Sequence, residues 1–219
     1  MGERILIINP NSSVSCTAGI AAAVAGFSAP GLPRIEVTRL AGGPPAIVTW
    51  RDWFSVVEPL CRVIETEAAD AYIIGCVSDP GLDAARAATR RPVLGMFRSA
   101  VTAALNRADR FGVIGFTGLS RPRHDRALQA LGVGGRMAAW LPLELDMETL
   151  TDPVAPRARI EATAKALAAA GAQCIILGCA GMALHRAAAE QAAGVPVIEP
   201  AQAAVAAALV AVLAAREAA

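Results

Sequence analysis

The chain has 219 residues, of which 55% are hydrophobic, so it can fill the core of one large domain or of two small lobes. Its formal net charge is +1, and its 20 basic and 19 acidic residues are spread along the chain. This distribution excludes a basic patch for nucleic acid or for an anionic membrane. We therefore expect a globular protein whose partner is a small neutral or weakly charged molecule.

Neither the ends of the chain nor its cysteines indicate a secreted or membrane-bound protein. Residues 1–4 run directly into an apolar stretch, without the long apolar segment and cleavage site of a secretory signal, so we expect a cytoplasmic protein. The apolar run 201–214 is too short to span a bilayer and is expected to be a packed helix. Five cysteines occur without a C-x-x-C pair, which indicates neither a disulfide framework nor a zinc site.

Apolar runs with the length and composition of β-strands alternate with Ala-rich helical stretches along the whole chain. This alternation predicts an α/β protein in which mainly parallel sheets are covered by helices. In chain order, the strands of the first half are expected at 5–8, 35–40, 71–75 and 93–95. Those of the second half are expected at 111–115, 137–143, 173–178 and 195–198.

The two halves also resemble each other in sequence. The segment IIGC at 73–76 is matched by ILGC at 176–179, an offset of 179 − 76 = 103, and PVL at 92–94 is matched by PVI at 196–198, an offset of 196 − 92 = 104. A repeat of half the chain indicates two similar lobes, each with a four-stranded sheet, related by a pseudo-twofold axis. We expect lobe 1 at 1–98, completed by the C-terminal helix 203–219, and lobe 2 at 99–202, with the ligand site between them.

In open parallel sheets, ligand-binding groups lie at the carboxyl ends of strands. Cys76, Cys179, Asn11 and Thr117 all fall at such ends. Each of the two cysteines follows a strand and a glycine and precedes a predicted helix, whose dipole is expected to lower the thiol pKa from about 8.5 towards neutrality. Two such thiols facing each other suit inversion at a carbon, because one removes a proton while the other delivers one.

The other three cysteines, Cys16, Cys61 and Cys174, have no partner in the repeat. Cysteine is among the most frequently buried residue types and often serves as a small apolar core residue. We assign that structural role to these three.

Three segments resemble the aspartate/glutamate/hydantoin racemase superfamily, in particular its hydantoin and allantoin racemase branch. They are INPNSS at 8–13, GC at 75–76 with DPGL at 79–82, and LGCAGMA at 177–183. The resemblance covers nearly the whole chain. It implies a cofactor-independent racemase or epimerase that inverts the acidic α-carbon of a 5-substituted hydantoin or of allantoin. It also implies that Cys76 and Cys179 are the two acid/base thiols, and that Asn11 helps to hold an oxygen of the substrate.

Removal of an α-proton leaves negative charge on a carbonyl oxygen, which preorganised donors must stabilise. The residues expected to contact the substrate are Asn11, Ser12, Val77, Ser78, Thr117, Ala180, Gly181 and Arg98. A turn or helix-cap role is an equal alternative for Asn11. Arg98 is expected to bind a carboxylate or polar substituent, with an exposed or inter-lobe salt bridge as the alternative.

Two histidines and one segment also lie near the predicted strand ends. His124 lies in a charged helical segment and is expected on a solvated face, while His185 is expected to face solvent or a neighbouring subunit. The segment 42–53 is either a loop that closes over the cleft or a surface loop held by Trp50 and Trp53.

Three other functions remain open at this point: an aspartate or glutamate racemase, a maleate-type cis-trans isomerase, and a non-catalytic two-lobed binding domain. Ala180 and Gly181 stand where glutamate racemases usually carry Thr-His, which favours a substrate other than a free amino acid. Ala-rich outer helices favour a homo-oligomer.

The sequence predicts activity without a metal ion, pyridoxal phosphate or a nicotinamide. It contains no spaced metal ligands and no Gly-rich phosphate motif, and its single lysine, Lys165, is not suitably placed. Exhaustive dialysis against a chelator should therefore leave the rate of racemisation, followed by polarimetry, unchanged. Loss of activity that one added metal restores would contradict this prediction.

Overall fold

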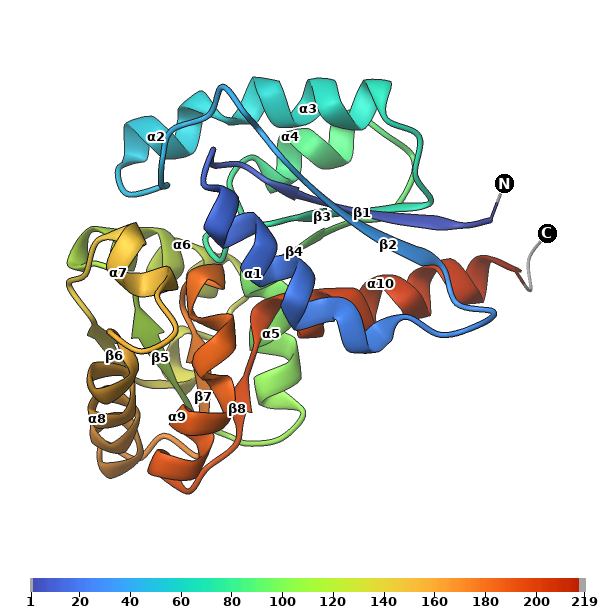
Figure 1. Ribbon diagram of the computed structural model, residues 1–219. Helices are drawn as coiled ribbons and strands as arrows, with labels where there is room; N and C mark the ends of the chain where they lie inside the picture. Colours follow the sequence, from blue (N-terminus) through green and yellow to red (C-terminus); the bar gives the residue numbers. More distant parts are fainter. Residues whose placement is uncertain (1, 217–219) are drawn as a thin grey trace.

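Eight parallel β-strands form two separate four-stranded sheets in the computed structural model, which describes residues 2–216 (Figure 1). The first sheet contains β1 (Arg4–Asn9), β2 (Arg34–Arg39), β3 (Ala71–Ile74) and β4 (Val93–Gly95). The second contains β5 (Phe111–Gly115), β6 (Met137–Pro142), β7 (Cys174–Leu177) and β8 (Val197–Ile198). All eight predicted strands are confirmed, with ends that differ by no more than two residues.

The two sheets have the same topology. Their strand orders are β2-β1-β3-β4 and β6-β5-β7-β8, and every neighbouring pair is parallel. The chain is therefore an α/β protein of two similar lobes, as the internal repeat predicted.

Helices cover both faces of each sheet. The longer helices are α1 (Val14–Val24), α3 (Val57–Thr66), α5 (Met96–Leu105), α6 (Arg121–Ala130), α8 (Arg157–Ala169), α9 (Arg186–Ala193) and α10 (Pro200–Arg216). Shorter ones are α2 (Trp50–Ser55), α4 (Leu82–Ala87), α7 (Met147–Thr151) and the 3-10 helices η1 (Ala25–Phe27), η2 (Gly118–Ser120), η3 (Gly134–Arg136) and η4 (Ala180–His185). Within residues 2–216, no helix has the length and apolar character needed to cross a membrane.

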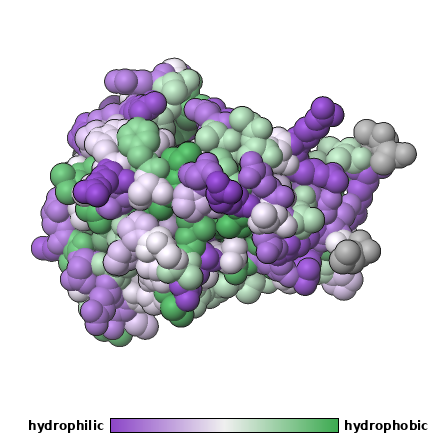
Figure 2. Space-filling model, turned by 90° about the horizontal axis from the view of Figure 1, so that it is seen from above, coloured by the Kyte–Doolittle hydropathy of each residue, from purple (hydrophilic) through white to green (hydrophobic). Residues whose placement is uncertain are grey.

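The outer layers follow from the alternation of side chains along each strand. Leu6 and Ile8 of β1 point to the outer face, where they join a buried cluster with Leu60 of α3 and Leu82 of α4. In the second lobe, a corresponding cluster forms under α8 and α9. The solvent side of α3 carries charged residues, and hydrophilic and hydrophobic residues are interspersed on the upper face of the molecule (Figure 2).

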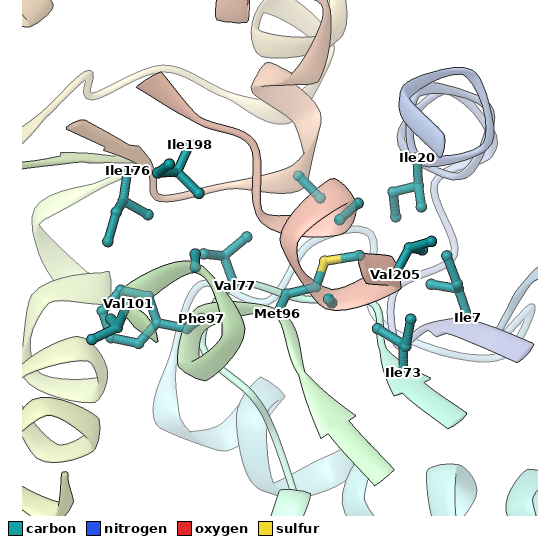
Figure 3. Packing of buried hydrophobic residues seen from close by; sticks show 14 of the residues in the cluster. Ile7, Ile20, Ile73, Val77, Met96, Phe97, Val101, Ile176, Ile198 and Val205 are labelled. Carbon is teal, nitrogen blue, oxygen red and sulfur yellow. The ribbon is translucent and has the colours of Figure 1, made fainter. Parts of the chain in front are cut away.

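The inner layer joins the lobes through two helices that follow the fourth strand of each sheet. Although α5 follows β4, it also packs against β7 and β8 of the second sheet, and α10, which follows β8, packs against β1, β3 and β4 of the first. Figure 3 shows the resulting apolar layer, in which Phe97 and Val101 of α5 lie on the side of Ile176, and Met96 of the same helix lies towards Val205. Residues 217–219 of the predicted C-terminal helix lie outside the described residues.

A buried carboxylate holds the first turn of each of these two helices. Asp79 accepts hydrogen bonds from the backbone N–H groups of Phe97 and Arg98 at 2.8 and 2.9 Å. Burial raises the pKa of Asp79 to about 6. In the second lobe, Glu199 holds its own helix and accepts from the Gln202 amide at 2.7 Å. Glu199 lies 199 − 95 = 104 residues after Gly95, so the repeat places a carboxylate where the first lobe has a glycine.

Gly95→Ala should lower the free energy of unfolding by about 1–3 kcal/mol, because the added methyl group has no free space beside the Asp79 side chain. Its Cβ would lie 2.4 Å from the carboxyl carbon of Asp79. Gly134→Ala is the matched control, since a Cβ at Gly134 has no neighbour within 4 Å, and its effect should stay below about 0.5 kcal/mol. Urea unfolding followed by circular dichroism measures both, and equal effects would contradict the tight fit at Gly95.

Candidate active site

A small cleft, partly open to solvent, lies where the carboxyl ends of the two sheets meet. Cys76 follows β3 of the first sheet and Cys179 follows β7 of the second, and both side chains line this cleft while remaining partly exposed. The remaining lining residues are Asn11, Cys16, Ile47, Gly75, Val77, Ser78, Phe116, Ser120, Arg123, His124, Met147, Gly178 and Ala180.

The glycine before each cysteine allows the chain to pass very close to the central strand. The N–H of Gly75 donates to the carbonyl of Ile8 at 2.8 Å, and that of Gly178 donates to the carbonyl of Ile114 at 2.7 Å. A Cβ at these glycines would lie 2.9 and 2.4 Å from the same carbonyl oxygens. Only glycine fits both places, so the two cysteines leave their sheets in the same way.

The backbone amide two residues further along the chain favours the thiolate of each cysteine. The amide of Ser78 favours the thiolate of Cys76, and the amide of Gly181, at 78 + 103 = 181, favours that of Cys179. The Ser78 hydroxyl also lies 3.4 Å from the Cys76 sulfur. The two thiols therefore have equivalent anion-stabilising amides at equivalent positions of the repeat.

The prediction that helix dipoles lower both thiol pKa values is wrong for the protein without substrate. No helix begins at Cys76, because residues 77–81 form a loop before α4, and Cys179 precedes only the 3-10 helix η4. Burial is the largest effect on both groups and raises the pKa of the Cys76 and Cys179 thiols above the ordinary value. The pKa of the neighbouring Cys16 thiol is likewise raised by burial, to about 11.

Asn11 has the turn role expected for it and also lines the cleft. Its Oδ1 accepts hydrogen bonds from the Ser13 amide at 2.9 Å and from Asn9 Nδ2 at 3.0 Å, which shapes the turn before α1. Its Nδ2 has only a weak contact, 3.9 Å from the sulfur of Cys16. Because Asn11 is buried and lines the cleft, this amide nitrogen remains available to donate to a bound molecule.

Besides Asn11, the structure brings four predicted substrate-contact residues to the thiols or their immediate surroundings, whereas Ser12, Thr117 and Arg98 are not part of the cleft lining. Val77, Ser78 and Ala180 line the cleft, and the backbone amide of Gly181 favours the thiolate of Cys179. Ser12 lies on a separate surface hollow beside α7. Thr117 begins η2, between the lining residues Phe116 and Ser120, and its buried hydroxyl has no partner in the described residues.

Arg98 lies in a neighbouring hollow outside the cysteine cleft. This hollow is lined by Arg98, Arg126, Leu82 and the aromatic residues of α2, and it shares Ser78 and Arg123 with the cleft. The Arg98 amide is held by Asp79, but its side chain is in no ion pair within residues 2–216.

Four polar residues of the cleft were not predicted to line it: Cys16, Ser120, Arg123 and His124. Cys16 is buried as predicted, but its side chain also reaches the cleft from α1. Arg123 and His124 reach it from α6. The available signal is the repeat, because α1 and α6 are the helices that follow the central strands β1 and β5 and start at the same sheet edge as the cysteines.

The predicted solvated position of His124 is wrong. His124 is 1% exposed and its ring stacks on Phe97 at a centroid distance of 4.3 Å. Trp140 Nε1 donates to its Nδ1 at 2.9 Å, so the ring proton is on Nε2, which donates to the carbonyl of Val77 at 2.9 Å. Burial lowers the pKa of His124 to about 4. The neutral ring thus links β6 of the second lobe to the Cys76 loop of the first.

The expected exposure of His185 is also wrong. His185 is buried in η4, where its Nε2 donates to the carbonyl of Asp152 at 3.1 Å, and it does not line the cleft. Burial lowers its pKa.

The segment 42–53 reaches the site through its second half. Ile47 lines the cleft, and Trp53 Nε1 donates to the carbonyl of Ser78 at 3.0 Å. Thr49 and Asp52 form a capping box at the start of α2. The tryptophan therefore holds the Cys76 loop from the outside.

No group of three or more His, Cys, Asp or Glu side chains in the described part of the chain is arranged to hold a metal ion.

Several known proteins are similar to this chain over most of its length. The model of the Asp/Glu/hydantoin racemase family matches residues 5–208. A hydantoin racemase from Paenarthrobacter aurescens is 35% identical to the chain, and the match covers 92% of the chain and 87% of that protein. One from Pseudomonas sp. (strain NS671) is 33% identical, and the match covers 90% of the chain and 80% of that protein. The solved allantoin racemase from Klebsiella pneumoniae has a TM-score of 0.88 at 28% identity, covering 97% of this chain and 89% of that one. These matches confirm the resemblance that the motifs indicated.

His124 should stay neutral at pH values well below the ordinary histidine pKa of 6.5, because burial lowers its pKa to about 4. Because the folded pKa is depressed, the stability that the neutral ring contributes is complete above pH 6.5 and is lost as the pH falls towards 4. Histidine NMR spectra measure this directly, since the chain has only two histidines and His185→Asn assigns the second signal. A midpoint near 6.5 would contradict the buried, doubly hydrogen-bonded ring.

Proposed function

Since the chain belongs to the Asp/Glu/hydantoin racemase family, we propose that it is a cofactor-independent racemase or epimerase that inverts the acidic α-carbon of a hydantoin-like ring through Cys76 and Cys179. The observation that carries the proposal is the pairing of these two thiols in one cleft. They come from equivalent positions of the two lobes, each with its own anion-stabilising amide.

Inversion requires only proton transfer. One sulfur, as a thiolate, takes the proton from one face of the α-carbon, and the electron pair of the C–H bond moves towards the adjacent carbonyl oxygen. The opposite thiol then delivers its proton to the other face, which forms the new C–H bond. The protonation states of the two sulfurs are exchanged at the end, so the enzyme is ready for the reverse reaction.

The composition of the cleft favours a hydantoin or allantoin ring over a free amino acid. Ile47, Phe116 and Met147 supply apolar walls, and none of the described lining residues is an aspartate or glutamate. The ammonium group of an amino acid would therefore enter without a carboxylate partner, which is costly in a partly buried site. A 5-substituted hydantoin carries no such charge. The relatives named hydantoin racemase and allantoin racemase agree with this choice.

In Cys76→Ser and in Cys179→Ser, the rate of racemisation should fall by orders of magnitude, because a hydroxyl is a poor base at neutral pH. The residual reactions of the two variants should differ. In deuterated water, Cys179→Ser retains Cys76 and should exchange the α-proton of one enantiomer, while Cys76→Ser should exchange that of the other. Polarimetry and NMR measure the two reactions on a panel of 5-substituted hydantoins, allantoin, aspartate, glutamate and maleate.

Cys61→Ser is the matched control, because Cys61 lies on α3 outside the cleft, and this variant should keep wild-type activity. The uncatalysed exchange of hydantoin α-protons is subtracted. Exchange of the same enantiomer by both active-site variants, or full racemisation by one of them, would exclude the two-thiol mechanism. Ligand binding to the wild type without turnover of any compound would favour a binding domain.

A further inference from the structure

Arg123 is a buried cation of the cleft that uses only part of its hydrogen-bonding capacity. The residue is 3% exposed, and its guanidinium carries five N–H donors. Nη1 donates to the carbonyl of Leu119 at 3.1 Å and Nη2 to that of Val48 at 2.9 Å, while the buried Nε has no acceptor in residues 2–216. A buried charge with unused donors is costly unless another group compensates it.

The neighbouring carboxylates are committed to other groups. Asp52 accepts from the amides of Val48 and Thr49 at 3.1 and 2.7 Å, and Asp79 holds the start of α5. Among residues 2–216, no carboxylate oxygen lies within 4.0 Å of the Arg123 guanidinium. The positive charge is thus available to a molecule that enters the cleft.

The position of the guanidinium is fixed before any such molecule binds. The two carbonyl acceptors come from separate segments, one before α2 and one before α6, and the guanidinium also lies over the ring of Trp50 at 5.7 Å. Donors that are held in place in this way need no reorganisation during a reaction, which is the property required of groups that stabilise developing charge.

The positive charge of Arg123 also affects the pKa of the Cys76 thiol. Arg123 favours the thiolate of Cys76 and so lowers the pKa of that thiol, in opposition to the larger effect of burial. The guanidinium, the Cys76 thiol and the amide nitrogen of Asn11 all belong to the lining of one small cleft.

We propose that Arg123 binds the substrate by donating to the ring carbonyl oxygen beside the reacting carbon, and that it holds the negative charge that collects on this oxygen. The inference rests on the proposed racemase function. The C–H bond breaks, its proton goes to a thiolate and its electron pair to the carbonyl oxygen facing Arg123. A proton from the opposite thiol then forms the new bond, and the charge leaves the oxygen. No oxidant, reductant or further reactant takes part.

Arg123→Met should lower kcat/KM for racemisation by roughly 100- to 1000-fold, the usual effect of removing one donor to a developing oxyanion. Arg123→Lys keeps the charge and should retain more activity than Arg123→Met. Arg126→Met is the matched control, because Arg126 lies on the same helix and over the same tryptophan, at 6.0 Å, but is exposed and outside the cleft. It should stay within about threefold of the wild type, which is the range of a surface substitution. Circular dichroism establishes that each variant is folded.

A second measurement needs no substrate. Alkylation of Cys76 by iodoacetamide at pH 7.5, followed by mass spectrometry, should be roughly tenfold slower in Arg123→Met, because loss of the guanidinium raises the pKa of the thiol and leaves less reactive thiolate. It should be unchanged in Arg126→Met. In Arg123→Ala, added guanidinium chloride at millimolar concentration should restore part of both the alkylation rate and the racemisation.

A folded Arg123→Met variant that racemises within threefold of the wild type would overturn the inference while leaving the two-thiol reaction intact. If the wild type itself racemises no compound of the panel, the proposed function fails, and alkylation then decides the role of Arg123. An unchanged alkylation rate at Cys76 in Arg123→Met would show that the guanidinium does not act in the cleft.

Discussion

The apolar packing of α5 and α10 determines where the two thiols lie. Each helix follows the last strand of one sheet and also packs against the other sheet, so the lobes share one inner core. Interiors packed in this way do not deform continuously, because each displaced side chain meets others. Cys76 and Cys179 come from different lobes, and their placement in one cleft therefore depends on this core. The helices are in turn fixed at their first turns by the buried carboxylates of Asp79 and Glu199.

The two cysteine loops have equivalent backbones but different supports. The loop after Cys76 is held by its own Asp79, which binds the first turn of α5, and by two side chains from other elements, His124 on the carbonyl of Val77 and Trp53 on the carbonyl of Ser78. The segment after Cys179 instead folds into η4, which packs against α1, α7 and α9. The pseudo-twofold symmetry thus extends to the sulfurs and their amides and does not extend to the cations and rings around them.

The strands and the cysteine pair could be predicted because their signals are local. Apolar runs, the preceding glycines and the offsets of 103 and 104 residues are all readable in one sequence. Arg123 and His124 were not predicted as site residues, because the segment RPRHDR has the composition of a solvated helix and only packing against Trp50, Phe97 and Trp140 buries these two side chains. The dipole effect on the thiols was wrong for a similar reason. Asp79, at a positive φ of 47°, and Gly81, at 66°, delay the helix after Cys76, which periodicity does not reveal.

Under the proposed mechanism, a racemase needs equivalent acid/base groups on the two sides of the reacting carbon, whereas the group that binds the carbonyl oxygen need not be duplicated. The two enantiomers present opposite faces of the α-carbon to the thiols, so an acid/base sulfur is needed on each side. The carbonyl oxygen that takes up the negative charge is the same atom in both directions of the reaction, so a single fixed cation serves both. This explains why a chain built from two similar halves carries two equivalent cysteines but one buried arginine in the cleft. In the second half of the repeat, α6 carries Arg123 into the cleft, whereas in the first half α1 carries Cys16.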